Sequence, residues 1–457
     1  MRTNLLRCRT VWLLALCVLA TPSLPAATSG PARPNLVFIL ADDLGWGDVG
    51  WHGSKIQTPQ LDALARSGVK LERHYAAPVC SPTRTGLLTG RFWSRFGVTN
   101  PQNERALPFA TLTLPRALQG AGYETALIGK WHLGSRTEWG PNRFGFDHGY
   151  GSLAGGVEPW EHRYKSGPFS QTWHRNGELI AEPGHVTDLI ATEAVNWLER
   201  RTSRPFFLYV AFSAPHIPIR EPEQYLKLYP DVRDEAMRHY AACVTHMDAA
   251  VGRLVSALDR KRLRERTLIV FSSDNGASLG ARNDDRQYPH GADYPAGPAH
   301  GSSQPWRAGK GTLYEGGIRV PAFAHWPGQL RPGEVRAPVH IVDWMPTLCA
   351  LAGVRFQQPT LHDGQNVWPL ISGTAKPEPR TLYWLGTGSR SQALLHGDWK
   401  LVITRGTPER VELFNLATDP YEQDNVAERE PERLAALRER LQEVAAGDNT
   451  ARATDDR

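Results

Sequence analysis

The stretch NLVFILADD, from Asn35 to Asp43, decides the fold because an uninterrupted apolar run ends abruptly in two aspartates. Continuous apolar runs of this length are typical of strands that are buried on both faces. Three later runs have the same form: ETALIG (124–129), PFFLYVAFSA (205–214) and TLIVFSS (267–273). Helical patterns separate these runs. We therefore expect an α/β fold with a large mixed, mostly parallel sheet between helices.

The chain between and after these runs predicts the remaining elements. From Met237 to Leu258 the apolar positions step by three and four, which predicts one long helix packed on the sheet. Residues 277–309 are rich in Gly, Pro, Asp, His and Ser, and they predict a long irregular loop. After about residue 375, the runs TLYWL, SQALLHGDWKLVI and VELFNL predict a smaller antiparallel sheet, followed by a charged helix over 431–446.

The N-terminus predicts export. Three arginines precede an apolar segment (11–20) and small residues follow it, which is the pattern of a secretory signal peptide. The apolar segment is too short to span a membrane, so we expect no membrane span. We expect a signal peptide at 1–27, a large domain that carries the functional site at 28–374, and a C-terminal subdomain with a frayed tail at 375–457. The mature protein should be periplasmic or secreted.

The charge balance weakens one class of function. The chain has 52 basic and 47 acidic residues, and removal of the three signal arginines leaves 49 against 47. No basic tract stands out, so we expect no nucleic-acid partner.

The cysteines do not predict a disulfide framework. Cys8 and Cys17 leave with the signal peptide, and the three that remain are widely spaced. Cys243 and Cys349 lie in apolar patterns and are predicted to be core residues. Cys80 has different neighbours.

Polar residues follow each predicted strand, at the sheet edge where ligands bind in open α/β sheets. Aspartates and an asparagine follow the first and last of these strands, and carboxylate and amide oxygens suit calcium or magnesium rather than zinc. A DD or DNG alone is typical of a cap or turn, but two such ends after buried strands favour a cation site. The residues at the four strand ends are Asp42, Asp43, Lys130, His132, His216, Asp274 and Asn275.

Cys80 begins a second pattern, CSPTRTGLLTGR. Pro82 suits the first turn of a helix, so Cys80 should face a positive helix end with free backbone N–H groups. Arg84 lies one turn further on the same face, and together they would hold a tetrahedral oxyanion. The alternative is a buried helix N-terminus with a solvated arginine. Lys310, in GKGTLYEGG, is a further cation at a loop position.

These motifs resemble those of the type I sulfatases. CSPTR followed by LLTGR is similar to the maturation signature of that family, and GKWHLG is similar to its second signature. ADDLGWGD, SAPHIP, SSDNG and GKGTLYEGG stand in the family's order, and the resemblance runs over roughly residues 33–430. It implies an alkaline-phosphatase-like fold and a sulfatase, an enzyme that hydrolyses sulfuric esters.

The resemblance also implies the cofactors. A separate formylglycine-generating or anaerobic sulfatase-maturating enzyme would oxidise Cys80 to formylglycine. One hydroxyl of the aldehyde hydrate would attack the sulfur, and the second would allow release of sulfate. One calcium ion would be held by Asp42, Asp43, Asp274, Asn275 and the residue at Cys80.

The remaining roles follow from the same resemblance. Arg84, Lys130 and Lys310 would bind the sulfate and stabilise the developing charge. His132 would be the base that collapses the hemiacetal intermediate, and His216, with Lys310, would protonate the leaving alcohol. Many relatives add a serine after the second signature, but the best match in GYGSLAGGVEPWEH is a glycine. Ser152 is only a weak candidate.

The substrate is predicted from longer stretches such as PHIPIREPEQYLKLYPDV, which look most like the N-acetylgalactosamine-4-sulfatase (arylsulfatase B) type. They imply a sulfated saccharide with galactose or N-acetylgalactosamine units. Two alternatives stay open. One is a phosphodiesterase or phosphonate monoester hydrolase of the same superfamily, although its two-metal members need histidines where Asn275 follows Asp274. The other is a non-catalytic glycan-binding relative, which would lack a nucleophile or a metal ligand.

Overall fold

β1 (Asn35–Ala41) lies inside a ten-stranded sheet of order β11-β2-β10-β9-β1-β8-β4-β5-β6-β7. Its two neighbours, β8 (Phe206–Ala211) and β9 (Thr267–Ser273), run parallel to it. β4 (Glu124–Gly129) runs parallel to β8, and β5 (His148–Ser152) runs parallel to β4. Every residue of β1 is buried. The predicted parallel strands are therefore confirmed.

Short strands complete both sides of the sheet, and all of their pairings are antiparallel except that of β11 with β2. β10 (Phe323–His325) pairs with β9, and β2 (Val69–Leu71) and β11 (Gly333–Val335) lie beyond it. On the other side, β6 (Trp173–Arg175) and β7 (Glu178–Leu179) extend the sheet from β5. The sheet is mixed but mostly parallel, as predicted.

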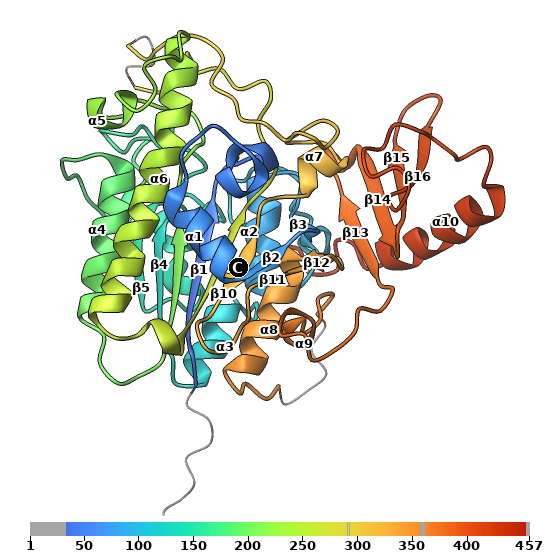
Figure 1. Cartoon of the computed structure of the whole chain (residues 1–457), viewed down its shortest axis with the longest axis horizontal. Coiled ribbons are helices and arrows are strands. Elements are labelled where there is room, and N and C mark those ends of the chain that lie inside the picture. Colours follow the sequence, from blue (N-terminus) through green and yellow to red (C-terminus); the bar gives the residue numbers. More distant parts are fainter. Residues whose placement is uncertain (1–32, 290, 292, 357–361, 454–457) are drawn as a thin grey trace, which may run out of the picture. The chain divides into compact units, whose positions relative to one another are not determined.

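One face of the sheet is covered by α1 (Pro59–Ser67), α4 (Val186–Glu199) and α6 (Glu235–Arg260). Val37 and Ile39 of β1 point toward these helices, because successive strand residues face opposite sides. α4 and α6 lie side by side (Figure 1). The long helix predicted around residues 237–258 is α6.

The opposite face is covered by α2 (Cys80–Thr89), α3 (Leu114–Gly120) and α8 (Trp344–Leu351). Phe38 and Leu40 of β1 belong to this second hydrophobic cluster. Cys349 of α8 and Cys243 of α6 are both buried free cysteines, so their prediction as core residues is confirmed. Shorter elements connect these layers: β3 (His74–Tyr75), β12 (Val339–His340), α5 (Glu223–Leu226), α7 (Glu315–Ile318) and α9 (Trp368–Ile371).

The C-terminal part forms a four-stranded antiparallel sheet with a helix packed on it (Figure 1). SQALLHGDWKLVI contains two strands joined by a tight turn at Gly397, where φ is 60°. The apolar side chains of this sheet continue the cluster that contains α2 and α8. A domain boundary near residue 375 stays a prediction. The elements are β13 (Thr381–Leu385), β14 (Ser391–His396), β15 (Trp399–Thr404), β16 (Arg410–Asn415) and α10 (Pro431–Ala445).

The computed structural model describes residues 33–289, 291, 293–356 and 362–453. The predicted signal peptide lies outside these residues. In the described part of the chain, no helix is both long and apolar enough to cross a membrane. The described residues of the loop 277–309 form no helix, and their only strand-like pairing is an isolated bridge between Arg282 and Pro298.

Candidate active site

The loops after β1, β4, β8 and β9 bring the predicted residues to one edge of the sheet, next to the start of α2. Ion pairs join residues that are far apart in the sequence. Eight of the ten predicted residues are buried, while His216 and Lys310 are half-buried. The buried set is Asp42, Asp43, Cys80, Arg84, Lys130, His132, Asp274 and Asn275.

Three cations pair with three carboxylates in this cluster. The Arg84 guanidinium lies 2.8 Å from Asp274 Oδ2. The Lys310 ammonium donates to both carboxylate oxygens of Asp43, at 2.6 and 2.8 Å. Lys130 forms the third pair, with Asp42. Because three positive and three negative charges cancel, a divalent cation would leave the cluster net positive, which favours a bound anion.

Two buried oxygens in the cluster fit a hard cation. Asn275 donates its amide N–H to Asp43 Oδ1 at 2.8 Å, so its own Oδ1 points away from that bond. Within the described structure, Asn275 Oδ1 and Asp42 Oδ1 are buried without a hydrogen-bond partner. An unsatisfied buried polar atom costs about 1–3 kcal/mol. Calcium or magnesium, which prefers such oxygens, would satisfy both atoms.

The carboxylates of Asp274 and Asp42 lie close to each other in the same cluster. Burial and the neighbouring carboxylate of Asp42 raise the pKa of Asp274 to about 6. Oxygens of Asp42 and Asp274 lie with Cys80 Sγ in a group whose atoms are all within 4.8 Å of one another. The predicted metal ligands therefore do lie together, with Cys80 beside them.

Two residues in this cluster have an unusual backbone. Asp43 and His132 adopt the left-handed conformation, with φ of 66° and 57°. Such conformations cost non-glycine residues of the order of 1 kcal/mol or more and persist where the surroundings impose them. In both residues, the strained turn comes just after a buried strand.

Cys80 is the first residue of α2 and is only 2% exposed. The hydroxyl of Thr83 accepts from the Ala77 N–H and donates to the Asp274 carbonyl, so it ties the start of α2 to the loop after β9. Burial raises the pKa of the Cys80 thiol, although Lys130 and Lys310 oppose this effect. The side chain is therefore a neutral thiol, and the thiolate is the form that acts as a nucleophile.

Arg84 is completely buried. Besides its pair with Asp274, it donates a hydrogen bond of 2.8 Å to the Lys130 carbonyl. The alternative interpretation as a solvated arginine is therefore wrong. Because Arg84 of α2 contacts both Lys130, after β4, and Asp274, after β9, its guanidinium also fixes the relative position of these segments.

The two histidines are neutral for the same main reason. Burial, then the nearby cations Lys130 and Arg84, hold the pKa of His132 well below its usual range. Burial lowers the pKa of His216 to about 3, although Asp43, whose Oδ2 lies 3.9 Å from His216 Nε2, opposes this. Both imidazoles are therefore in the neutral form near neutral pH.

The loop after β5 departs from the family pattern in a way that the structure explains. Ser152 turns its hydroxyl to the Ala154 carbonyl and the Thr172 hydroxyl, each at 3.2 Å, so it has a structural role. A Cβ on Gly155 would lie 2.2 Å from His132 Nε2, so the glycine backbone itself packs against that imidazole.

Sequence reasoning missed Tyr288. A Cβ on Gly156, which follows Gly155, would lie 2.0 Å from the Tyr288 hydroxyl and 3.7 Å from the ring of His216. The Tyr288 hydroxyl therefore lies close to the loop that borders His216. Tyr288 comes from the irregular loop 277–309 and is 4% exposed. Its only sequence signal was an aromatic residue in a polar loop, which is too weak to assign it to the site.

Comparisons with known proteins identify the family of this chain. The family model Sulfatase matches residues 34–354, and the model N-sulphoglucosamine sulphohydrolase, C-terminal matches residues 307–447. The chain is 32% identical to Arylsulfatase J of Mus musculus, over 91% of this chain and 76% of that protein. It is also 32% identical to N-acetylgalactosamine-6-sulfatase of Mus musculus, over 88% of this chain and 78% of that protein.

A solved structure extends the similarity to three dimensions. Ps i-CgsB in complex with k-i-k-neocarrahexaose superposes with a TM-score of 0.81 at 29% identity, over 93% of this chain and 95% of that chain. Since the family model covers most of the chain and the relatives align along nearly all of it, the chain belongs to the sulfatase family and is a sulfuric ester hydrolase of alkaline-phosphatase-like fold.

Proposed function

We propose that this sulfatase removes sulfate from galactose or N-acetylgalactosamine units of a sulfated carbohydrate, with a formylglycine made from Cys80 and one calcium ion. Two similarities support a carbohydrate substrate. One relative is named N-acetylgalactosamine-6-sulfatase, and the similar solved structure is in complex with k-i-k-neocarrahexaose. The motifs quoted for the N-acetylgalactosamine-4-sulfatase type support the same sugar class.

The position of Cys80 carries the proposal for the nucleophile. Its side chain lies beside Asp42 and Asp274, among three cations, yet its thiol is held neutral by burial. A neutral thiol is a weak nucleophile. Formylglycine, as its hydrate, would supply a geminal hydroxyl at the same position. Oxidation by the separate maturation enzyme is therefore part of the proposal.

The proposed calcium ligands are Asp42, Asp43, Asp274 and Asn275, with the modified Cys80 beside them. The unsatisfied oxygens of Asp42 and Asn275 support this set, because they need a cation or donor that the described protein atoms do not supply. When bound, calcium would supply positive charge that attracts a sulfate oxygen.

The exposed fractions of the remaining side chains suggest which part of the substrate each would contact. Arg84 and Lys130 have no exposed side-chain surface, whereas the side chains of Lys310 and His216 are 17% and 19% exposed. The sulfate would thus lie over the buried cations, and its carbohydrate would leave on the side of Lys310 and His216. This arrangement supports His216 with Lys310 as the pair that gives a proton to the leaving alcohol, with the Lys310 ammonium as the source of the proton because His216 is neutral, and His132 as the base.

The decisive experiment is mass spectrometry of the tryptic peptide 74–84, from protein purified from its native host. Conversion of the Cys80 side chain from CH₂SH to CHO removes H₂S and adds one oxygen. We expect that mass, or the mass of its hydrate, together with hydrolysis of 4-nitrophenyl sulfate that is lost in Cys80→Ala. An unmodified thiol in fully active protein would refute the proposed nucleophile.

Parallel assays test the other parts of the proposal. Activity should disappear on calcium chelation and return with calcium. Turnover of 4-nitrophenyl sulfate should exceed that of nitrophenyl phosphate diesters and phosphonates, because Asn275 replaces a second-metal histidine. Release of sulfate from sulfated galactosides, compared with sulfated glucosamine, tests the sugar. Preference for the phosphorus esters would support the phosphonate hydrolase alternative instead.

A further inference from the structure

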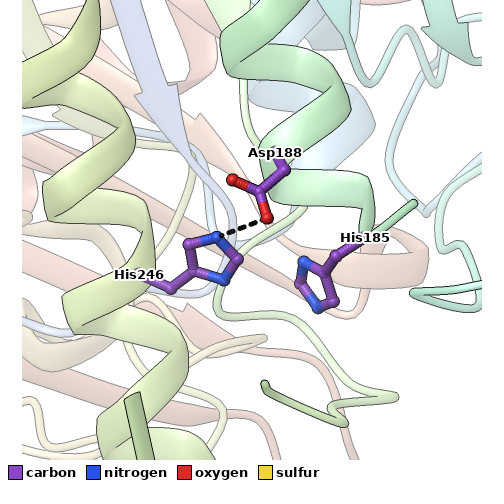
Figure 2. Close-up of side chains that lie close together, drawn as sticks. All are labelled: His185, Asp188 and His246. Carbon is purple, nitrogen blue, oxygen red and sulfur yellow. Dashed lines mark ion pairs between the residues drawn. The ribbon is translucent and has the colours of Figure 1, made fainter. Parts of the chain in front are cut away.

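A second group of ionisable side chains lies between α4 and α6, outside the proposed sulfatase site. His185 is the N-cap of α4, Asp188 lies in the first turn of that helix, and His246 faces them from α6. Figure 2 shows the three side chains pointing toward one another. One ligand atom from each lies within 4.8 Å of the other two. Both histidines are buried, at 3% and 1% exposed.

One distance in this group equals the separation of neighbouring ligands around a metal ion. His246 Nε2 lies 3.4 Å from Asp188 Oδ2, but this buried nitrogen has no hydrogen-bond partner in the described structure. The edge of a tetrahedron around zinc, with bonds of about 2.0–2.1 Å, is about 3.4 Å. The gap between these two atoms is therefore the separation expected for neighbouring zinc ligands.

The neighbouring groups orient these side chains. Glu221 Oε2 lies 2.7 Å from His246 Nδ1, and such a carboxylate–histidine pair fixes the ring so that its other nitrogen faces a metal. Glu221 Oε1 lies 3.4 Å from His185 Nε2. Arg253 binds Asp188 Oδ1 at 2.9 Å, which leaves Oδ2 directed at His246.

We propose that His185, Asp188 and His246 bind a divalent transition-metal ion of the zinc type, with Glu221 as the positioning residue for His246. Two imidazoles and one carboxylate favour zinc over calcium, in contrast to the oxygen ligands at the sheet edge. The Asp188 side chain is 43% exposed, so an ion can enter from solvent and water can occupy a fourth position.

The ion would add a link between α4 and α6, beside the loop after β8. Through Glu221, it would also hold that loop. That loop also carries His216, and one small pocket is lined by His185, Glu221 and His216 together. Binding to the folded state alone would raise thermal stability with metal concentration.

The test uses the full mature chain in excess calcium, with Cys80→Ala as the parent so that its thiol cannot bind the added metal. Cobalt(II) is titrated as a spectroscopic probe and zinc is then used to displace it. We expect one saturable cobalt per chain, tetrahedral visible absorption, and a higher melting temperature with zinc. Asp188→Asn and His246→Gln should abolish these effects, and Glu221→Gln should weaken binding about 10- to 100-fold.

The matched control is His325→Gln, which changes a buried histidine of β10 outside this group and should keep the parent's binding curve. Asp188→Asn is the deciding variant if His246→Gln does not fold, because Asp188 is half-exposed. Absence of saturable cobalt or zinc binding by the parent would overturn the proposal. Equal binding by the parent and Asp188→Asn would overturn it as well, and would leave a protonated His246 between two carboxylates as the explanation of the group.

Discussion

Lys310 is the most accessible cation among the residues that meet at the sheet edge. It contacts both carboxylate oxygens of Asp43, and that carboxylate keeps the Lys310 side chain charged by raising its pKa against the effect of burial. Lys310→Gln should lower kcat/KM for sulfate esters by about 10²–10³, because it removes charge from the position proposed for the leaving group. Steady-state kinetics with 4-nitrophenyl sulfate measure this loss.

Lys165→Gln is the control for that measurement. Lys165 pairs with Asp285 at 2.6 Å near the aromatic ring of Tyr288, but it does not contact the acidic cluster. Its replacement should change kcat/KM by less than about threefold, as expected for removal of one partly exposed ion pair. Equal losses in both variants would contradict a specific role for Lys310.

At this scale, polar residues that follow apolar runs could be predicted because strand ends in a parallel sheet meet at one edge. Asp42, Lys130 and Asp274 all follow this rule. Tyr288 and Gly155 could not be predicted, since their importance depends on close approach between loops that have no periodic pattern. The pairing of each cation with a carboxylate also requires three-dimensional distances.

Among the elements, α4 is fixed to the sheet by Glu193. This 7% exposed side chain accepts from His148 of β5 at 2.9 Å and from Arg175 of β6 at 2.8 Å. Burial alone would raise the pKa of Glu193, but these two partners outweigh it and lower the pKa to about 2. The ionised carboxylate therefore stabilises the folded state above its ordinary pKa of 4.5.

Glu193→Gln should therefore lower the free energy of unfolding by about 2 kcal/mol at pH 7. The difference from the parent should shrink as the pH falls from 4.5 toward 2, because the parent's carboxylate then takes up its proton in both states. Urea unfolding at several pH values checks this. The control is Glu199→Gln. Glu199 lies on α4, like Glu193, and forms an exposed ion pair with Arg260 of α6, so its replacement should lower the free energy of unfolding by less than about 1 kcal/mol at every pH.

Long elements were easier to predict than short ones. The 26 residues of α6 repeat their apolar spacing often enough to stand out, and β1 is an unbroken apolar run. The short strands β2, β6 and β7, near the two sides of the sheet, have two or three residues each, which is too few to show a period. Their existence depends on pairing with neighbouring strands.

For the molecule as a whole, Lys400 joins the C-terminal sheet to the segment that carries Lys310. From β15 it reaches Glu315 at 2.8 Å, at the start of α7, and Glu422 at 2.7 Å, with at most 1% of any of these side chains exposed. Removal of the ammonium would leave two buried carboxylates facing each other, which costs about 3–5 kcal/mol. Lys400→Met should lower the urea midpoint accordingly.

The comparison for Lys400 is Arg438→Met, which removes the exposed pair between Arg438 and Glu409 at 2.8 Å. It should cost less than about 1 kcal/mol, because exposed ion pairs are screened by water. A comparable loss in the two variants would show that the buried pairs do not hold the sheets together. The existence of the second sheet could be predicted from its alternating pattern, but this attachment between Lys400 and Glu315 could not.

If Cys80 is modified as proposed, its burial imposes an order on the biosynthesis of the protein. The sulfur lies under the start of α2, and its neighbour Arg84 has no exposed surface at all. An enzyme that recognises the segment from Cys80 to Arg84 needs it extended and accessible, and neither condition holds once β9 has paired with β1. Any modification of Cys80 must therefore come before the sheet closes, so a chain that folds before it meets the modifying enzyme is trapped with its thiol.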